Sequence, residues 1–407
     1  MRRPMQGVRI LEVAQFTFVP SAGVVLADWG ADVIKVEHAV SGDAQRGLAQ
    51  LGVVKVGAGV NPVMEHANRG KRSIGLDVGH PEGRRVLYEL AKTSDVFLTN
   101  FLPAARRRLE IEVEHLRAVN PRIIYVRGTA LGDRGAERER GGYDMTGYWC
   151  RAGSASGATP ADLNGVVTQP SPAYGDSIGG MTIAGGIAAA LFARERGGEP
   201  SVVDVSLLST GMWAMGMGVA LSAQSGTPWT APPSGAHGSP ANPLVGVYRT
   251  RDDRFVSLVM LQAFRYWADF CRHIERPELT RDPRFADAAQ LAAHTADAAA
   301  IIREVIATRT LAEWSRRFAT LEGQWAPVQN SIEVAADPQA RANGYLLPVE
   351  AADGSSFEMV SSPVQFDETP PATRRCPEFA EHTEELLLEL GLDWDEIGRL
   401  RESGAIG

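Results

Sequence analysis

Asp176 is the residue whose setting most clearly permits chemistry. It follows Gly175 at the end of a flexible stretch and precedes a run of small and apolar residues. One interpretation is structural, because an Asp at a helix start accepts hydrogen bonds from the first-turn amides as an N-cap. The other is functional: a helix N-terminus stabilises an ionised carboxylate, which can act as a covalent nucleophile. Position alone leaves both interpretations open.

A second group of candidate residues follows the first predicted strand. This turn, Gln15–Ser21, has the sequence QFTFVPS and contains no G-x-G-x-x-G, although Glu37 ends the next strand where a ribose-binding acid would lie. Without those glycines a pyrophosphate cannot approach the backbone closely, which argues against a nicotinamide enzyme. The chain also lacks a P-loop and a G-x-S-x-G elbow, which argues against an NTPase and an α/β-hydrolase.

Composition excludes further classes. Three cysteines lie more than 100 residues apart and no two histidines are four residues apart, so we expect neither a disulfide framework nor a metal site. The net charge of −8 argues against a nucleic-acid partner. The longest apolar run, Met181–Ala193, is too short to span a bilayer. We therefore expect a soluble, cytoplasmic, bacterial protein without a membrane partner.

Alternating strands and helices must position these side chains. Short β-branched runs predict strands, and the segments between them, several opening with Pro, predict helices. This alternation is typical of a doubly wound α/β domain with a parallel sheet. The predicted strands are Val8–Val13, Asp32–Glu37, Ser73–Val78, Asp95–Thr99, Arg122–Arg127 and Val202–Val205. The predicted helices are Pro20–Trp29, Pro81–Thr93, Ala104–Val119, Ile178–Arg194 and Ser209–Ala223.

A smaller α+β domain is predicted beyond a Pro-rich linker at Pro228–Pro243. A β-hairpin at Gly246–Met260 opens it, and three helices follow. A second Pro-rich stretch, Pro363–Pro377, precedes two C-terminal helices. Ala152–Pro172, which leads to Asp176, is a long loop of the kind that is usually functional or disordered.

Several segments, in order along nearly the whole chain, resemble the class III CoA-transferases (CaiB/BaiF type). This group includes formyl-CoA transferase, carnitine CoA-transferase and α-methylacyl-CoA racemase. The matching segments are Gly7–Glu37, Asn68–Val78 (NRGKRSIGLDV), Asn100–Pro103, Asn120–Val126, Gly175–Gly198, Val203–Leu208, Asp282–Phe285 and Glu381–Leu392.

The resemblance implies a fold and an assembly. Residues 1–224 would form a large CoA-binding α/β domain and residues 225–345 a linker with the small domain. Residues 346–407 would return to the large domain, and two chains would form an intertwined homodimer. The implied partners are an acyl-CoA donor and a carboxylate acceptor, with CoA as a substrate and no tightly bound cofactor.

The resemblance also implies roles for individual residues. Asp176 falls on the family's catalytic aspartate, which forms a mixed anhydride and then an aspartyl-CoA thioester. Backbone amides near it are the expected oxyanion donors. The residues expected to bind CoA are Thr17, Phe18, His38, Leu76, Asp77, Val78, Asn100, Phe101, Leu102, Arg108, Gly142 and Tyr143.

Three departures from the family pattern carry expectations of their own. Phe18 and Val19 replace small residues before Pro20, which predicts a tighter opening. His38 replaces an Arg, which weakens one phosphate contact because imidazole is mostly neutral at pH 7. The glycine-rich lid of formyl-CoA transferase has no close match. Ser234–Gly238 is the nearest segment, which argues against a short-chain acid as substrate.

Two alternatives to a CoA-transferase stay open. A 2-methylacyl-CoA racemase of the same family would use a His–Asp dipeptide as a base, whereas this chain has Tyr143–Asp144. A phenol with a pKa near 10 is a poor base for that step, which favours the transferase. A non-catalytic CoA-binding protein is the second alternative, and the intact Asp176 argues against it.

Overall fold

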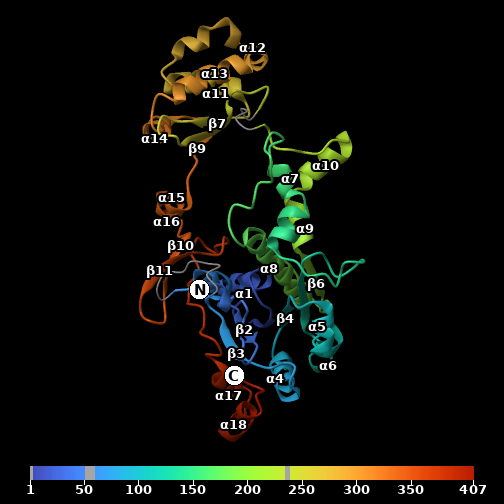
Figure 1. Cartoon of the computed structure of the whole chain (residues 1–407). Helices are drawn as coiled ribbons and strands as arrows, with labels where there is room; N and C mark the ends of the chain where they lie inside the picture. Colours follow the sequence, from blue (N-terminus) through green and yellow to red (C-terminus); the bar gives the residue numbers. More distant parts are fainter. Residues whose placement is uncertain (1–2, 51–59, 234–238) are drawn as a thin grey trace. The chain divides into compact units, whose positions relative to one another are not determined.

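The computed structural model of the chain describes residues 3–50, 60–233 and 239–407 (Figure 1). These residues form two compact units, each assembled from separate stretches of the chain. Unit 1 comprises Met1–Ala158, Val166–Trp229 and Pro338–Gly407, and unit 2 comprises Thr159–Gly165 and Thr230–Asp337. The domain division at residues 224 and 345 that the sequence suggests stays a prediction.

The main sheet of unit 1 is parallel, with the order β3-β2-β1-β4-β5-β6 among the described residues. Its strands are short apolar runs, mostly buried because helices cover both faces. The strand order reverses between β1 and β4, as in doubly wound α/β folds, which confirms the predicted fold class. The strands are β1 (Arg9–Val13), β2 (Asp32–Glu37), β3 (Arg72–Gly75), β4 (Val96–Thr99), β5 (Ile124–Thr129) and β6 (Val202–Ser206).

Further elements of unit 1 are helices and one hairpin. The helices are α1 (Phe18–Asp28), α2 (Arg46–Gln50), α3 (Pro62–Asn68), α4 (Pro81–Lys92), α5 (Pro103–Arg108), α6 (Val113–Val119), η1 (Met145–Cys150), α7 (Ser154–Ala158), α8 (Tyr174–Glu195), α9 (Leu207–Ala214), α10 (Gly216–Ser225), α16 (Pro338–Ala342), α17 (Thr383–Glu389) and α18 (Trp394–Glu402). The antiparallel hairpin pairs β10 (Leu346–Glu350) with β11 (Ser356–Val360).

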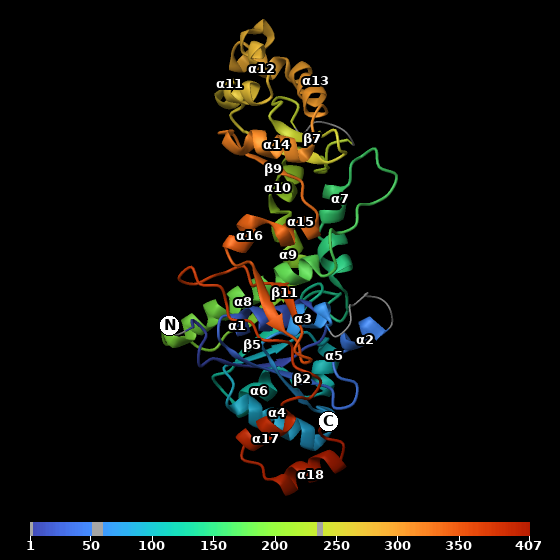
Figure 2. The same cartoon turned by 90° about the vertical axis from the view of Figure 1, so that its left-hand side faces the viewer.

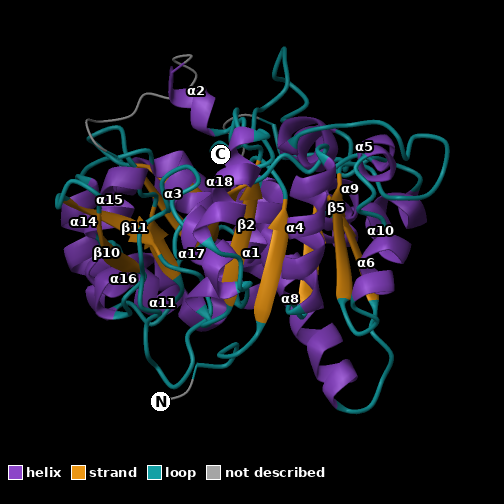
Figure 3. Ribbon diagram, turned by 90° about the horizontal axis from the view of Figure 1, so that it is seen from below, coloured by secondary structure: helices purple, strands orange, loops and turns teal. Residues whose placement is uncertain are grey.

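Two hydrophobic cores lie on opposite faces of the sheet, because successive strand residues point to opposite sides. Ile10 of β1 packs into the core formed with α1 and α8. Its neighbour Leu11 packs into the core formed with α4, α6, α17 and α18. Figure 2 shows β2 and β5 between these two layers, and Figure 3 shows the sheet from the side of α4 and α17. The C-terminal helices therefore complete the second core.

Helix α8 approaches α1 closely through small residues. A Cβ atom at Gly179 would overlap the Phe18 ring, and one at Gly180 would overlap the Ser21 side chain and lie tight against the α1 backbone. By length and composition alone α8 is long and apolar enough to cross a membrane, although the run noted in the sequence is shorter. A core helix passes the same test, and Ile183 of α8 is part of the core against α1.

A buried cluster of charges ties the first strand to its neighbours. The Glu12 carboxylate accepts two hydrogen bonds of 2.8 Å from Lys71 Nζ and lies 3.4 Å from Lys35 Nζ. Lys35 Nζ also lies 2.8 Å from Asp43, and Lys71 Nζ donates to Asn68 Oδ1. These charges are almost completely buried, so each depends on its partners for stabilisation.

Unit 2 is a small α+β domain with its own core. Its antiparallel sheet contains the predicted hairpin, with Asp253 in a left-handed turn conformation (φ 59°), and a third strand that the sequence analysis missed. Its elements are β7 (Val245–Arg249), β8 (Phe255–Val259), α11 (Ala263–His273), η2 (Pro277–Arg281), η3 (Pro283–Phe285), α12 (Ala288–Ala293), α13 (Thr295–Ile306), α14 (Leu311–Arg317), η4 (Phe318–Thr320), β9 (Trp325–Pro327) and α15 (Ser331–Ala336).

Three predicted helices differ from those observed. The charged helix predicted over Ala104–Val119 is interrupted at Glu110, which has a φ of 56°, so α5 and α6 are separate. The helix predicted over Ser209–Ala223 is interrupted at Met215. The helix predicted from Ile178 begins earlier, at Tyr174, which places Asp176 inside its first turn rather than before it.

Replacing Lys71 with Met tests the buried charge cluster. The change leaves Glu12 with only the longer contact to Lys35, and breaking a buried pair costs about 3–5 kcal/mol of unfolding free energy. Chemical denaturation measures this loss. As a control, Arg341→Met removes the exposed pair with Glu358, which we expect to have no measurable effect. An equal, negligible loss in both variants would show that the cluster does not stabilise the fold.

Candidate active site

A cavity of about 1020 Å³ lies within unit 1, at the carboxyl ends of the parallel strands. In doubly wound folds ligands bind at this edge, where the strand order reverses. The segments after β1 and β4 both contribute to its wall, so the cavity lies at that reversal. The predicted site residues that line it are Phe18, His38, Leu76, Asp77, Val78, Asn100, Phe101, Leu102, Arg108, Gly142, Tyr143 and Asp176.

Thr17 is the predicted site residue that does not line the cavity. Its side chain is buried, and Oγ1 donates to Gln45 Oε1 at 3.0 Å. Its carbonyl oxygen accepts hydrogen bonds from the Ser21 amide and hydroxyl in the first turn of α1. Thr17 therefore stabilises the turn from inside, and a contact with CoA does not follow from its place.

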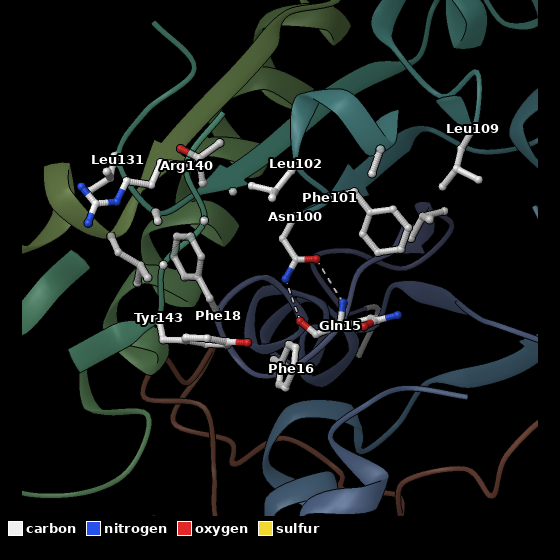
Figure 4. Close-up of a pocket in the computed structure, with 18 of the residues that line it drawn as sticks. Gln15, Phe16, Phe18, Asn100, Phe101, Leu102, Leu109, Leu131, Arg140 and Tyr143 are labelled. Atoms are coloured by element: carbon white, nitrogen blue, oxygen red, sulfur yellow. Dashed lines mark hydrogen bonds between the residues drawn. The ribbon is translucent and has the colours of Figure 1, made fainter. Parts of the chain in front are cut away.

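The turn after β1 is shaped by side chains from other strands. Asn100, which follows β4, accepts from the Gln15 amide at 3.1 Å and donates to the Gln15 carbonyl oxygen at 2.7 Å (Figure 4). Asp43 accepts from the Phe16 amide at 3.2 Å, and Phe16 has a left-handed φ of 64°. The side-chain amide of Asn100 thus stabilises the turn by hydrogen bonding, although Asn100 also lines the cavity.

Two aromatic rings meet above this turn. The rings of Phe16 and Tyr143 are edge-to-face, with centroids 5.5 Å apart and planes at 85°. Tyr143 is 65% exposed, so its ring lies outside the hydrophobic core. Phe18 packs against Gly128 and Gly179, where it fills a wall of the cavity.

The part of the cavity near β2 and β3 combines apolar and polar groups. Leu76 and Val78 are buried apolar walls. His38 is exposed, and its Nδ1 accepts from the Val40 and Ser41 amides, so Nε2 carries the proton of the neutral ring. His38 thus has one N–H to offer a ligand, where an Arg would offer several.

The three consecutive arginines of α5 have different environments. Arg106 is buried against Glu112 and Asp133, and Arg107 pairs with Glu139. Arg108 lines the cavity and forms no ion pair with any residue that the structure describes. Of the three, Arg108 is therefore the one available to an anionic ligand.

Carboxylates that line the cavity are Glu37, Asp77 and Asp176. Glu37 accepts from Arg46 and Ser73, and although burial opposes its charge, the hydrogen bonds from Arg46 lower its pKa. Asp77 accepts from the amides of the following turn. Within the described ranges, the Asp176 side chain forms no hydrogen bond, so Asp176 is the lining carboxylate that is free to react.

Asp144 supplies the cap that the sequence suggested for Asp176. The helix α8 begins after Ala173, which has a left-handed φ of 58°, and Asp176 lies in its first turn. The Gly175 amide donates to Asp144 Oδ1 at 3.1 Å. The N-cap interpretation of Asp176 is therefore wrong, and the sequence analysis noted Asp144 only as a neighbour of Tyr143.

The Asp144 carboxylate also affects the charge of Asp176. Burial, and then the negative charge of Asp144, raise the pKa of Asp176 to about 7. This opposes the stabilisation that a helix N-terminus gives to an anion. Near neutral pH the Asp176 carboxyl is therefore poised between its protonated and nucleophilic forms.

The comparisons with known proteins agree with this geometry. The profile of CoA-transferase family III matches residues 5–383. The chain belongs to this family. It is 27% identical to (R)-2-hydroxy-4-methylpentanoate CoA-transferase of Clostridioides difficile over 408 residues, covering 99% of each chain. It is 30% identical to cinnamoyl-CoA:phenyllactate CoA-transferase of Clostridium sporogenes over 398 residues, covering 97% of this chain and 95% of the relative.

A solved structure shares the fold of this class III CoA-transferase. A CaiB/BaiF family protein from Brucella suis has a TM-score of 0.80 and covers 96% of this chain and 100% of its own. At 24% identity this likeness concerns the fold alone. The segment Ser234–Gly238, compared above with a glycine-rich lid, lies outside the described residues.

The pH dependence of the CoA-transferase tests the coupling of Asp176 to Asp144. If the ionised Asp176 carboxylate is the reacting group, kcat/KM should fall as pH drops through about 7. In Asp144→Asn the amide oxygen still accepts from Gly175, but the charge is gone, so the pKa of Asp176 falls and the acidic limb moves to lower pH. Rate profiles over pH 5–9 measure this shift.

The matched control is Asp269→Asn in unit 2. Asp269 is also a buried aspartate that accepts a backbone amide, from Glu322 at 3.0 Å, but it lies in the other unit. The Asp269→Asn change should leave the acidic limb of the kcat/KM profile at the same pH as in the wild type. An unchanged limb in Asp144→Asn would show that the two carboxylates do not interact.

Proposed function

We propose that this class III CoA-transferase moves CoA from an acyl-CoA donor to a carboxylate acceptor through covalent intermediates on Asp176. The observation that carries the proposal is the free carboxylate of Asp176 in a cavity whose other carboxylates are engaged. The family match and the curated relatives, which are named as CoA-transferases, support it.

The proposed reaction exchanges one thioester for another. The Asp176 carboxylate attacks the donor thioester carbonyl, and CoA leaves as a thiolate, which gives an enzyme-bound mixed anhydride. The thiolate then attacks the aspartyl carbonyl, releases the donor carboxylate and forms an aspartyl-CoA thioester. The acceptor carboxylate attacks this thioester and expels CoA thiolate, which leaves a second mixed anhydride between the acceptor and Asp176. The thiolate then attacks the acceptor's carbonyl carbon, which forms the product acyl-CoA and frees the Asp176 carboxylate. Because a thioester is exchanged for a thioester, no ATP is required.

The surroundings of Asp176 must stabilise two oxyanions and exclude water. The first-turn amides of α8 were the expected oxyanion donors, but they are directed at Asp144. We therefore propose that the donors come from other groups of the cavity wall.

CoA is proposed to lie along the carboxyl edge of the sheet, as an exchanged substrate rather than a resident cofactor. Leu76, Asp77 and Val78 would surround the adenine, and Arg108 would meet a phosphate. The pantetheine arm would pass Asn100–Leu102 toward Asp176. The cavity, which all of these residues line, is large enough for such an extended ligand.

We propose an apolar acyl group larger than formyl as the substrate. Around the cavity the side chains of Phe16, Phe18, Leu131, Tyr143 and Leu207 are apolar or aromatic. Such walls favour hydrocarbon groups because their burial removes apolar surface from water. The two relatives compared above are named for branched and aromatic acids, which fits this proposal.

No observation favours the racemase over the transferase. Asp144 is engaged with the N-terminus of α8, and Tyr143 replaces the His of the racemase dipeptide. Incubation of a chiral 2-methylacyl-CoA in deuterated water distinguishes the two. A racemase would incorporate deuterium at the α-carbon, whereas the transferase would leave that position unlabelled. CoA binding with neither reaction would indicate the non-catalytic alternative.

Asp176→Asn tests the proposed nucleophile. An amide is not a comparable nucleophile, so transfer should be lost while CoA still binds, because Asp176 is not a phosphate contact. Transfer assays and calorimetric CoA titration measure the two properties. Asp287→Asn is the matched control, because Asp287 caps α12 by accepting from Gln290 and Asn caps equally well. Turnover of Asp176→Asn within about tenfold of wild type would refute the assignment.

We also propose a homodimer, which the family resemblance implies. The helices α9 and α10 present exposed apolar side chains, and no side chain of α10 is buried. On α9 and α10, Trp213 is 88% exposed and Met217 is 80% exposed. Large exposed apolar side chains on two consecutive helices suit an interaction site, and we propose that a second copy of the chain covers them.

Light scattering tests the homodimer. We expect twice the chain mass of 43.8 kDa for the wild type at micromolar concentration. Trp213→Ser should shift the mass toward that of the monomer because it removes a central apolar contact. Trp394→Ser, which changes another exposed tryptophan in α18, should have no effect. A wild-type mass near that of one chain would contradict the proposal.

A further inference from the structure

The first turn of α8 is held by side chains from elsewhere in the chain. Its N-cap residue, Ala173, has no side-chain hydrogen bond and a left-handed backbone, which is strained for a residue other than glycine. Asp144 accepts from the Gly175 amide on one side. The second restraint comes from His66 on α3, a residue outside the cavity wall that the proposed reaction does not use.

His66 binds the residue next to Asp176. Its Nε2 lies 2.9 Å from Ser177 Oγ. The Ser177 hydroxyl donates its own hydrogen to the Ala173 carbonyl oxygen at 2.9 Å, so it can only accept from His66. The imidazole therefore carries its proton on Nε2, and a chain of two hydrogen bonds joins α3 to the strained residue before α8.

The imidazole is neutral when it makes this contact. Burial, and then the charge of Arg69, lower the pKa of His66 below its ordinary value. Around neutral pH the ring thus donates one directed hydrogen bond without adding a positive charge beside Asp176. A cation at this place would lower the pKa of Asp176 and favour a tight ion pair over nucleophilic attack.

Helix α3 is a firm support for this contact. Asn61 caps it by accepting from Met64, and Arg69 at its end forms a buried pair with Asp28 of α1. Glu65 accepts from the Cys376 amide at 2.7 Å. Because α3 is bound to both α1 and the C-terminal segment, the position of His66 is fixed. Its hydrogen bond in turn fixes the position of the Ser177 hydroxyl.

We propose that His66 is a positioning residue that, through Ser177, fixes the first turn of α8 and hence the direction of the Asp176 carboxylate. This inference rests on the proposed role of Asp176 as nucleophile. His66 does not line the cavity, so it acts on the turn rather than on the substrate. Small errors in the direction of a reacting group reduce rates strongly, because attack requires aligned atoms within about 3–3.5 Å.

The test compares His66→Phe, His66→Gln and Ser177→Ala. His66→Phe keeps the ring but loses the donor, so kcat should fall about tenfold or more while KM for acyl-CoA stays unchanged. His66→Gln supplies an amide N–H at a similar distance and should regain most of the activity. Ser177→Ala should reproduce the loss, and the double variant with His66→Phe should be no worse than either single change.

The pH profile separates positioning from a general loss of stability. A released turn lets water reach Asp176, so in His66→Phe its pKa falls and the acidic limb of kcat/KM moves to lower pH. His273→Phe is the matched control. His273 lies in unit 2 and its Nε2 also contacts a hydroxyl, Thr320 Oγ1 at 3.0 Å. This change should leave kcat and the limb unaltered, whatever its effect on the melting temperature.

The outcomes distinguish this inference from the proposed function. If Asp176→Asn retains transfer, the proposed function fails. If Asp176→Asn is inactive but His66→Phe and Ser177→Ala both keep the wild-type kcat and pH limb, only the role of His66 is refuted. Should His66→Phe not fold, Ser177→Ala decides, because it removes only one hydroxyl.

Discussion

The buried carboxylate of Glu12 is the constraint on which the geometry of the site depends. It binds the ammonium groups of Lys71 and Lys35, and each of these two groups also binds a different segment of the chain. Lys35 binds Asp43, whose other oxygen accepts from Phe16 in the turn after β1. Lys71 binds the Pro20 carbonyl oxygen and so fixes the start of α1. Burying charges costs free energy. The cluster therefore contributes by fixing the orientation of the turn after β1 and of the start of α1, as well as by stabilising the fold.

The same cluster extends to the residues around Asp176. Lys71 binds Asn68 at the end of α3, the helix that carries His66. Asp176 thus lies on a turn whose supports, Asp144 and His66, are themselves fixed by the folded core. Its carboxyl is nevertheless electrostatically frustrated, because burial and Asp144 oppose its charge. If Asp176 is the proposed nucleophile, this setting favours its reaction, because attack sacrifices no hydrogen bonds of the carboxylate.

The sequence predicts the sheet and the cavity better than it predicts the contacts within them. Apolar β-branched runs bounded by turns identified the six strands, and the order of a doubly wound fold then brings Asn100 and the Gln15–Ser21 turn to one edge. The breaks at Glu110 and Met215 escaped because neither residue is a Gly or Pro, the residues that most clearly signal an interruption. The cap by Asp144 escaped because it joins residues 31 positions apart, across a segment that contains η1 and α7. The role of Thr17 in binding CoA stays a prediction, because a pattern gives its position in a turn but not that its hydroxyl faces Gln45.

Phe18 shows how a departure from the family pattern acts through packing. The sequence suggested that a phenylalanine before Pro20 narrows the opening of the site. In the structure its ring packs against Gly179, where a Cβ atom would overlap it, and against Gly128, where a Cβ atom would overlap Val19 and lie tight against the ring. The ring therefore forms part of the cavity wall between α1 and α8. Other residues bound the part of the cavity near Asn100. Because α8 also carries Asp176, the distance between these two helices sets both the shape of the cavity and the depth at which Asp176 lies in it. The bulky ring of Phe18 fits between α1 and α8 because α8 has Gly179 opposite it.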